Sequence, residues 1–176
     1  MTLLDRLQRV TEVPILLLAA DPAGIGEAAH RWEAAGLCAR AVRGWKMRTV
    51  TALFDEISSA LQFPLYFGEN WAAFDECLTG LALPPQAQLG GIVLAIADAD
   101  QLLVDADVPE FGNLLLSLVD AHAAFSRAVA LGQSWDRPPI AFHVVLACTS
   151  DQINALRSML ERVVDMSVIE TVHLDM

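Results

Sequence analysis

The stretch "GIVLAIADAD", residues 91–100, carries the clearest indication of the fold. Its apolar residues follow one another without a polar break as far as Asp98, a length that suits a strand better than a helix. Because polar residues do not alternate with apolar ones, both faces of this strand are expected to be buried. Such a pattern is typical of a central strand in a parallel sheet, which helices cover on both sides.

Runs of the same kind recur along the chain, and segments with a helical apolar pattern separate them. Strands that alternate with helices predict an α/β fold with a mainly parallel sheet and helices packed against it. The predicted strands are "PILLLAA" (14–20), "LCARAVRG" (37–44), the run at 91–97 and "IAFHVVLAC" (140–148). The predicted helices lie at about 21–36, 49–64, 70–80, 111–132 and 150–164. "SVIETVHLDM" (167–176) is a further candidate, for a strand at an edge of the sheet.

The composition favours one folded domain. Of 176 residues, 55% are hydrophobic and 19% are charged, which is unlike a disordered chain and leaves enough apolar surface for a sizeable core. The chain shows no internal repeat, low-complexity tract or linker. We therefore expect a single α/β domain over residues 1–176.

The charge is unevenly distributed. The formal net charge is −11, and no Lys or Arg occurs between Arg48 and Arg127. That stretch holds eleven acids, whereas the eleven bases and the other eleven acids lie outside it and cancel. A field of this kind repels nucleic acid and anionic membranes and attracts cationic partners. We expect neither nucleic acid nor a membrane as a partner.

Cysteine usage and the N-terminal segment indicate a cytoplasmic protein. Three cysteines are far apart in the sequence and form no CxxC or Cys/His spacing, which argues against disulfides and zinc. The apolar run at 13–20 is too short to span a bilayer, and Asp5, Glu12 and Pro14 argue against a signal peptide. We predict free thiols in a reducing compartment, and no metal or other cofactor.

One motif leaves a nucleotide-binding protein or an enzyme open as an alternative. Residues 24–29, Gly-Ile-Gly-Glu-Ala-Ala, match GxGxxA after the first predicted strand. However, Asp21 and Pro22 are a helix start, which would place both glycines inside the first turns. The carboxylates of Asp75 and Glu76 diverge by about 100° on a helix, so they do not form a catalytic pair. We therefore expect the protein not to be an enzyme.

The segment "YFGENWAAFDECL", residues 66–78, combines aromatic and acidic residues around a Gly-Glu-Asn turn. A helix over about 70–80 is predicted, with Asn70 as its N-cap and Gly80 just past its end. Trp71, Phe74 and Leu78 recur at i, i+3 and i+7 and are expected to face the core. The opposite face is expected to carry Ala72, Asp75, Glu76 and Thr79.

The longer stretch "LQFPLYFGENWAAFDECLTG" (61–80) resembles the signature of the barstar family, intracellular inhibitors of barnase-type ribonucleases. The likeness extends upstream through "AVRGWKMRTVTALFDEISSAL" (41–61) and, in the order of elements, downstream to the strand at 140–147. It covers about residues 39–148. The resemblance implies a barstar-like α/β fold with about four strands, three from the family and one from an N-terminal strand–helix addition at 14–36. Residues 150–176 would add a C-terminal helix and tail.

The resemblance implies inhibition by occlusion, in which an acidic helix and the preceding loop plug the active site of a basic ribonuclease or toxin. In that arrangement Tyr66 stacks on the enzyme, Glu76 imitates a substrate phosphate, and Asp120 is a peripheral contact. The implied partner-binding residues are Tyr66, Phe67, Asn70, Ala72, Asp75, Glu76, Thr79, Gly80 and Asp120.

This chain departs from the family pattern at three positions near the helix. Ala72 stands where the family has an acid, and Asp75 and Leu81 stand where it has tryptophans. The departures point to a target other than a close barnase homologue, such as a different basic nuclease or toxin. They also leave a non-inhibitory interaction module on the same fold as an alternative.

Overall fold

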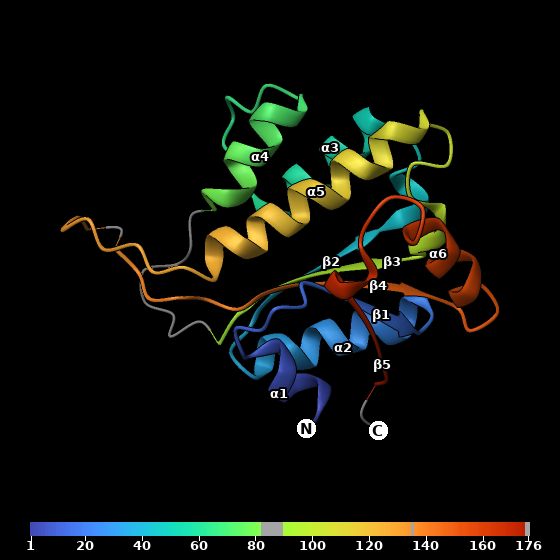
Figure 1. The fold of residues 1–176 in the computed structure, drawn as a ribbon, viewed down its shortest axis with the longest axis horizontal. Coiled ribbons are helices and arrows are strands. Elements are labelled where there is room, and N and C mark those ends of the chain that lie inside the picture. The colour runs from blue at the N-terminus through green and yellow to red at the C-terminus, as the bar shows by residue number, and fades with distance from the viewer. Residues whose placement is uncertain (82–89, 135, 175–176) are drawn as a thin grey trace.

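The computed structural model describes residues 1–81, 90–134 and 136–174, which form a five-stranded sheet covered by helices on both faces (Figure 1). All strand pairs are parallel, and the order across the sheet is β2-β3-β4-β1-β5. The strands are β1 (Ile15–Ala19), β2 (Cys38–Arg43), β3 (Ile92–Ala97), β4 (Phe142–Cys148) and β5 (Ile169–Val172). The predicted α/β class with a parallel sheet is confirmed.

Six α-helices and three short 3-10 helices connect the described strands. The α-helices are α1 (Leu3–Leu7), α2 (Pro22–Ala34), α3 (Val50–Leu61), α4 (Trp71–Thr79), α5 (Val108–Phe125) and α6 (Ile153–Leu160). The 3-10 helices are η1 (Gly44–Lys46), η2 (Ala99–Gln101) and η3 (Met166–Val168). Helices α1 and α2 lie on one side of the sheet, and α3, α4 and α5 form a layer on the other side (Figure 1).

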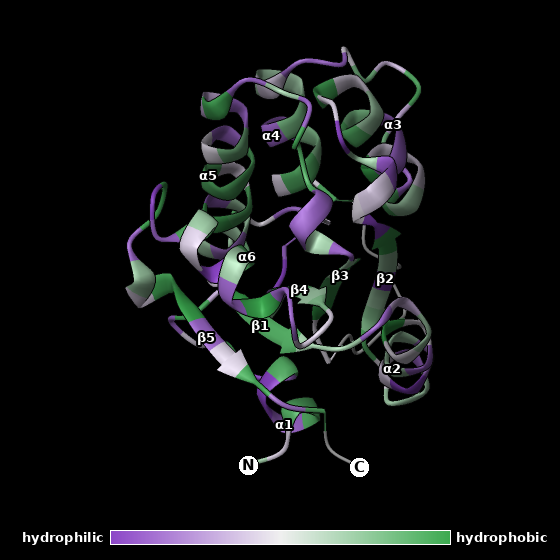
Figure 2. Cartoon of the chain, turned by 90° about the vertical axis from the view of Figure 1, so that its right-hand side faces the viewer, coloured by the Kyte–Doolittle hydropathy of each residue, from purple (hydrophilic) through white to green (hydrophobic). Residues whose placement is uncertain are grey.

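The predicted central strand is confirmed as β3, which is buried at every position. It pairs with β2 on one side, where Cys38 faces Ile92, and with β4 on the other, where Ile92 faces Phe142. β4 is also buried throughout. Figure 2 shows hydrophobic colours along β1, β3 and β4, whereas β5 carries hydrophilic and pale residues. Burial on both faces therefore accounts for the unbroken apolar runs of the sequence.

The sheet has five strands and not the expected four. The fifth strand is β5, which pairs with the outer edge of β1, so that Ile15 lies between Val144 and Ile169. β5 has only four residues, and Glu170 and Thr171 are exposed. It lies within the segment 167–176 that the sequence offered as an edge strand, so that interpretation is confirmed and accounts for the fifth strand.

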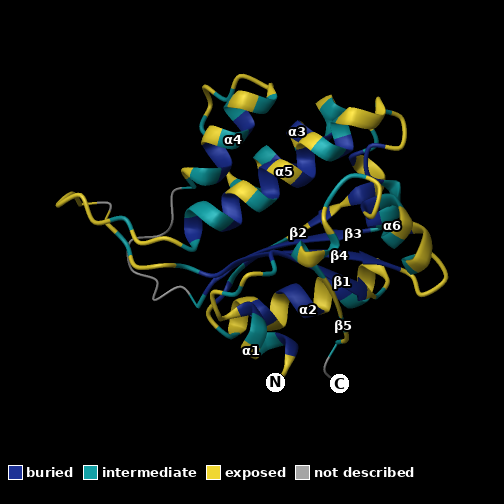
Figure 3. Cartoon of the chain, viewed as in Figure 1, coloured by how far each residue is buried: buried dark blue, intermediate teal, exposed yellow. Residues whose placement is uncertain are grey.

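The side chains of the sheet enter two separate cores. The larger core lies between the sheet and α3, α4, α5 and α6, and it includes Leu94 and Phe142. The smaller core lies under α1 and α2 and includes Leu16 and Val145. Figure 3 shows buried residues concentrated along the sheet and on the inner sides of the helices. The outer sides of α4 and α5 carry exposed residues.

Local capping explains where the helices begin. The Asp21 carboxylate accepts a hydrogen bond of 2.8 Å from the Gly24 amide, and Pro22 follows at the first helical position of α2. Thr49 caps α3 in the same way through the Ala52 amide.

Within the part of the chain that the structure describes, no helix is both long and apolar enough to cross a membrane.

Candidate partner-binding surface

The loop before α4 is held by its own hydrogen bonds. The Phe67 amide donates to the Pro64 carbonyl at 2.9 Å, which closes a turn around residues 65 and 66. The Asn70 side chain accepts from the Ala73 amide at 3.0 Å and donates to the Gly68 carbonyl at 3.0 Å. Asn70 is thus the predicted N-cap of α4, and it also ties the loop to the helix. The loop therefore enters the helix in a defined geometry.

A cluster of aromatic rings lies beneath this loop. Phe67 meets Phe54 edge-on at 5.6 Å between ring centroids and Phe63 at 5.2 Å. Phe74 is fully buried and lies 5.7 Å from Phe63. Edge-to-face pairs at these distances add to the hydrophobic stabilisation of the cluster. Phe67, which the resemblance placed among the contact residues, therefore packs inward and supports the loop from below.

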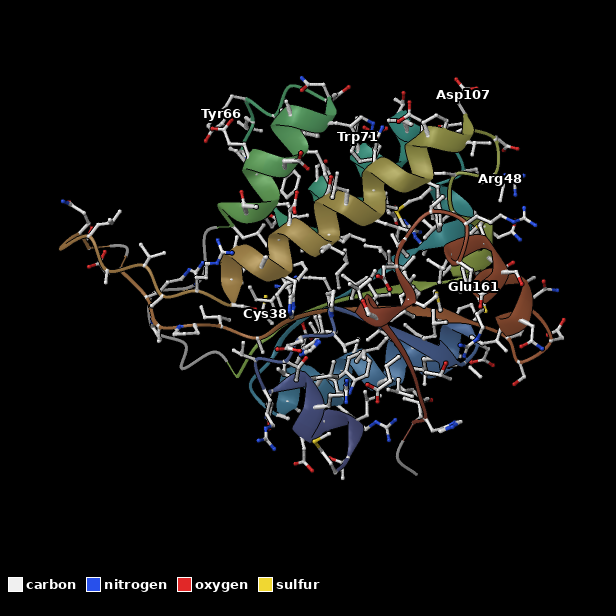
Figure 4. All side chains as sticks on the ribbon, in the orientation of Figure 1. Cys38, Arg48, Tyr66, Trp71, Asp107 and Glu161 are labelled. Carbon is white, nitrogen blue, oxygen red and sulfur yellow. The ribbon has the colours of Figure 1, made fainter. Side chains whose placement is uncertain are left out.

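Two apolar side chains at the tip of the loop face solvent. Tyr66 is 81% exposed and points away from the body of the fold (Figure 4). Leu65 is completely exposed beside it. Sequence reasoning singled out Tyr66 and missed Leu65. The position of Leu65 next to Pro64 indicates a turn, where an apolar side chain has little chance of burial. This pattern could have identified Leu65 from the sequence.

The outer face of α4 combines a free carboxylate with small residues. Ala72, Glu76 and Gly80 are exposed. Asp75 and Thr79 are half-buried, and the Thr79 hydroxyl donates to the Asp75 carbonyl at 2.7 Å. Glu76 is thus the outward carboxylate of the predicted polar face, while Asp75 and Thr79 lie at its flank.

Asp75 has one oxygen in an unusual position. Its Oδ1 atom is buried and has no hydrogen-bond partner among the described residues. An unpaired buried oxygen is costly, because the atom loses its contacts with water and gains none in return. The barstar pattern has a tryptophan at the position of Asp75. The half-buried environment of this position suits an apolar side chain better than a carboxylate.

Trp71 is anchored to the neighbouring helix α5. Its indole Nε1 donates to Glu110 Oε2 at 2.6 Å, and the Asn113 side chain donates to the same oxygen at 3.2 Å. Figure 4 shows Trp71 on the side of α4 that faces α5. Its ring also packs against Phe54 at 5.0 Å. The core-facing role predicted for Trp71 is therefore combined with a polar anchor at Glu110, which sequence reasoning did not identify.

We expect Glu110→Gln to loosen α4. Glutamine keeps an acceptor oxygen but removes the charge, so the bond to the Trp71 indole weakens and stability falls by about 1 kcal/mol. Indole N–H hydrogen exchange, followed by NMR, should show faster exchange at Trp71. Glu27→Gln, an exposed change on α2, is the matched control. Unchanged exchange at Trp71 in Glu110→Gln would show that Glu110 does not hold the helix.

Asp120 lies on α5, which packs against α4. Asp120 is exposed and lies in the same helical layer as Glu76. Among the residues that the structure describes, no ion pair involves Glu69, Asp75, Glu76 or Asp120. These four carboxylates are therefore not neutralised by an ion pair within the described residues.

Cations at the border of the acidic stretch are already engaged. Arg48 forms a two-pronged pair with Asp105 at 2.6 and 3.1 Å, and this hydrogen bonding lowers the pKa of the Asp105 carboxyl. Arg43 pairs with Glu56 at 2.7 and 2.9 Å, which lowers the pKa of Glu56. Both bases are therefore held by local acids and do not pair with the carboxylates of α4.

The glycine motif does not form a phosphate-binding loop. Gly24 and Gly26 lie within α2, and the Asp21 carboxylate already accepts from the Gly24 amide. At the nearby carboxyl end of β3, burial and the carboxylates of Asp100 and Asp21 raise the pKa of Asp98. A phosphate would meet these acids in place of free amides. In addition, no group of acids, histidines or cysteines among the described residues is arranged to hold a metal.

A comparison with protein families matches residues 38–147 to the family described as barstar, the barnase inhibitor. The match begins at the first residue of β2 and ends within β4, and it includes the loop, α4 and α5. The chain belongs to the barstar family. The predicted resemblance is therefore confirmed over most of its length, and β1, α2, α6 and β5 lie outside the matched barstar region.

The solved structures with a similar backbone fold that are described next have longer chains. The Aeropyrum pernix ORC2 protein, solved in ADPNP and ADP complexes, is 9% identical with a TM-score of 0.52 over 92% of this chain and 41% of its own. A chain of Drosophila ORC bound to AT-rich DNA and Cdc6 is 16% identical with a TM-score of 0.48, over 92% and 48%. The first likeness shows the fold alone. Among curated proteins the search finds no similar sequence.

Proposed function

We propose that this chain is a barstar-like inhibitor that binds a basic ribonuclease or toxin and covers its active site with the 64–70 loop and α4. The observation that carries the proposal is the combination at this site of exposed apolar side chains and a free carboxylate. Leu65 and Tyr66 face solvent, and the exposed Glu76 forms no ion pair with the described residues. Groups of this kind are suited to a partner with an apolar spot beside arginines or lysines.

Each residue of the surface has a role that its environment supports. Tyr66 offers a flat ring for stacking, and Glu76 accepts hydrogen bonds from a partner's guanidinium or ammonium group. Asn70 keeps the loop in the binding geometry, so little conformational entropy is lost on association. The exposed Ala72 and Gly80 carry almost no side chain, and they allow the partner's backbone to approach α4 closely.

The charge distribution assists the encounter. The chain carries −11, and the stretch between Arg48 and Arg127 holds eleven acids and no base. A basic protein is attracted toward this side over distances comparable with the Debye length, about 10 Å at 0.1 M salt. Steering of this kind raises the association rate and favours one orientation over others. In the cytoplasm, the protein would act as an immunity protein, by binding and not by catalysis.

The partner differs from barnase in the charge and shape of the surface that faces the start of α4. Ala72 is exposed where the family has an acid, and Asp75 replaces a tryptophan. A partner of this chain therefore lacks a cation opposite position 72 and has room for the half-buried Asp75 flank. A basic nuclease or toxin with a less cationic rim fits this description.

Titration calorimetry against a panel of small basic ribonucleases tests the proposal. We expect a dissociation constant on the order of nanomolar with one member. Raising the salt from about 50 mM to about 500 mM should weaken binding at least about tenfold, mainly through slower association. Binding that is indifferent to salt would contradict electrostatic steering, and no binding to any cationic ribonuclease would contradict the proposed partner class.

A non-inhibitory interaction module is the second candidate, and the exposed Ala72 favours it. Without the acid at this position the chain loses one of the family's contacts to the enzyme. Such a module would bind a cationic protein through Leu65, Tyr66 and Glu76 but leave its active site open. The two candidates differ in one result, because only an inhibitor abolishes RNA cleavage by the bound enzyme.

A further inference from the structure

The N-terminal segment lies outside the region matched to the family and covers one face of the sheet. Helix α1 places Leu3 and Leu7 in the core beneath α2, together with Leu16 and Trp32. Residues 8–13, here called the strap, then lead from α1 to β1. The strap has no helix or strand of its own, so its position depends on contacts with the rest of the fold.

Two buried histidines hold carbonyl groups of the strap. His122 of α5 is 6% exposed, and its Nε2 lies 2.8 Å from the Thr11 carbonyl oxygen. His143 of β4 is completely buried, and its Nε2 lies 3.0 Å from the Arg9 carbonyl oxygen. The two ring centroids are 6.0 Å apart. The pair therefore acts as one cluster, which we call the histidine clasp.

The two rings differ in their hydrogen-bond partners. His122 Nδ1 lies 2.7 Å from the Phe142 carbonyl oxygen, and its Nε2 lies 3.5 Å from the Ser126 hydroxyl as well as 2.8 Å from the Thr11 carbonyl oxygen. The Ser126 hydroxyl can donate or accept, so His122 has partners of both kinds. His143 needs one proton, on Nε2, because its Nδ1 is buried without a hydrogen-bond partner among the described residues. The closed clasp thus suits a neutral His143 ring with its proton on Nε2.

A positive charge is disfavoured at His143. Burial lowers the pKa of this imidazole below its ordinary value of 6.5, and the carbonyls of Arg9 and Val13, which favour the charged form, do not compensate. The charged groups that act on the ring are His122 from α5 and Arg6 from α1, and both lower the pKa further. Glu170 of β5 is engaged by Arg6. A second proton on His143 would therefore place a positive charge in a completely buried site, beside an Arg6 that Glu170 already pairs.

We propose that the histidine clasp is an acid-sensitive latch, in which protonation of His143 releases the strap and α1 from the sheet. The released segment gives His143 access to water and removes Arg6 from its surroundings. It also separates Leu3 and Leu7 of α1 from the core that they share with Leu16 and Leu18 of β1. The N-terminal addition is then a cover whose position responds to pH, independently of the α4 surface on the opposite side of the sheet.

The direction of the effect follows from the lowered pKa of His143. The open state, with an ordinary pKa of 6.5, binds a proton more readily than the closed state. The closed form is therefore fully favoured above about pH 6.5 and is progressively lost as the pH falls below that value. A difference of one pKa unit corresponds to a tenfold change in the equilibrium between the two forms.

Hydrogen–deuterium exchange of the whole chain tests the latch. Between about pH 7.5 and about pH 5, the protection factors of amides in residues 3–13 should fall about tenfold relative to those of β3. His143→Gln keeps a donor for the Arg9 carbonyl and does not titrate, so it should abolish this dependence. His30→Gln, at an exposed site on α2, should retain it.

Two results would overturn the latch: equal protection of residues 3–13 at both pH values, or an unchanged pH dependence in His143→Gln. Where His143→Gln fails to fold, an NMR titration of the wild-type ring decides the question. We expect the His143 ring to gain its second proton together with the loss of protection at residues 3–13. Protonation that leaves the strap protected would equally exclude the latch.

Discussion

Glu76→Ala should weaken binding to a cationic ribonuclease by about 2–5 kcal/mol, which corresponds to a loss of at least about 30-fold in affinity. Glu76 is the exposed carboxylate of α4, and no described cation pairs with it. In the complex it would become buried against a guanidinium or ammonium group. Removing it leaves that partner cation without its counter-charge, so most of the loss should appear as faster dissociation. Surface plasmon resonance separates the two rates.

The matched control for this change is Glu27→Ala. Glu27 is an exposed glutamate on α2, on the opposite side of the sheet from α4, and its removal changes the net charge by the same amount. We expect its affinity to remain within about threefold of wild type, because it alters only the long-range field. If the two variants lose equal affinity, Glu76 makes no contact of its own and only the overall charge matters.

Phe74→Ala should destabilise the fold by about 3–5 kcal/mol. The ring is fully buried and lies within 5.7 Å, between centroids, of Phe54, Phe63 and Trp71. Its removal leaves a cavity at the centre of the aromatic cluster that supports both the loop and α4. A loss of this size is a large part of the total stability of a small domain. Urea unfolding followed by circular dichroism measures it.

Tyr66→Ala is the control for Phe74→Ala. It also removes an aromatic ring from the same segment, but Tyr66 is 81% exposed and its loss should change stability by no more than about 0.5 kcal/mol. The same variant should weaken binding to the ribonuclease, so stability and binding separate between the two positions. Similar destabilisation by both changes would contradict the division of the segment into an inner and an outer side.

Local patterns in the sequence predicted the elements that local forces determine. The unbroken apolar runs predicted β3 and β4, because burial on both faces leaves no room for polar residues. Asn70 predicted the start of α4, because an amide side chain at the N-cap satisfies a free backbone group of the first turn. The same reasoning placed the glycines of residues 24–29 inside α2.

Contacts between distant residues were beyond the reach of these patterns. Trp71 and Glu110 are 39 positions apart, and nothing in either neighbourhood indicates the bond between them. His143 and the Arg9 carbonyl are 134 positions apart. The inward packing of Phe67 also depends on Phe54, which lies 13 positions earlier on α3. The orientation of side chains around the candidate surface is therefore a property of the assembled fold.

A titration of RNA cleavage with increasing amounts of this chain tests the proposed inhibition most directly. The enzyme should be the ribonuclease that binds tightest in calorimetry, and the titration should be repeated with the Glu76→Ala and Glu27→Ala variants. If the chain occludes the active site, RNA cleavage should fall in proportion to the amount of chain added. Cleavage should cease near an equimolar ratio for wild type and Glu27→Ala. Glu76→Ala should need a much larger excess. Undiminished cleavage by a ribonuclease saturated with the chain would contradict occlusion.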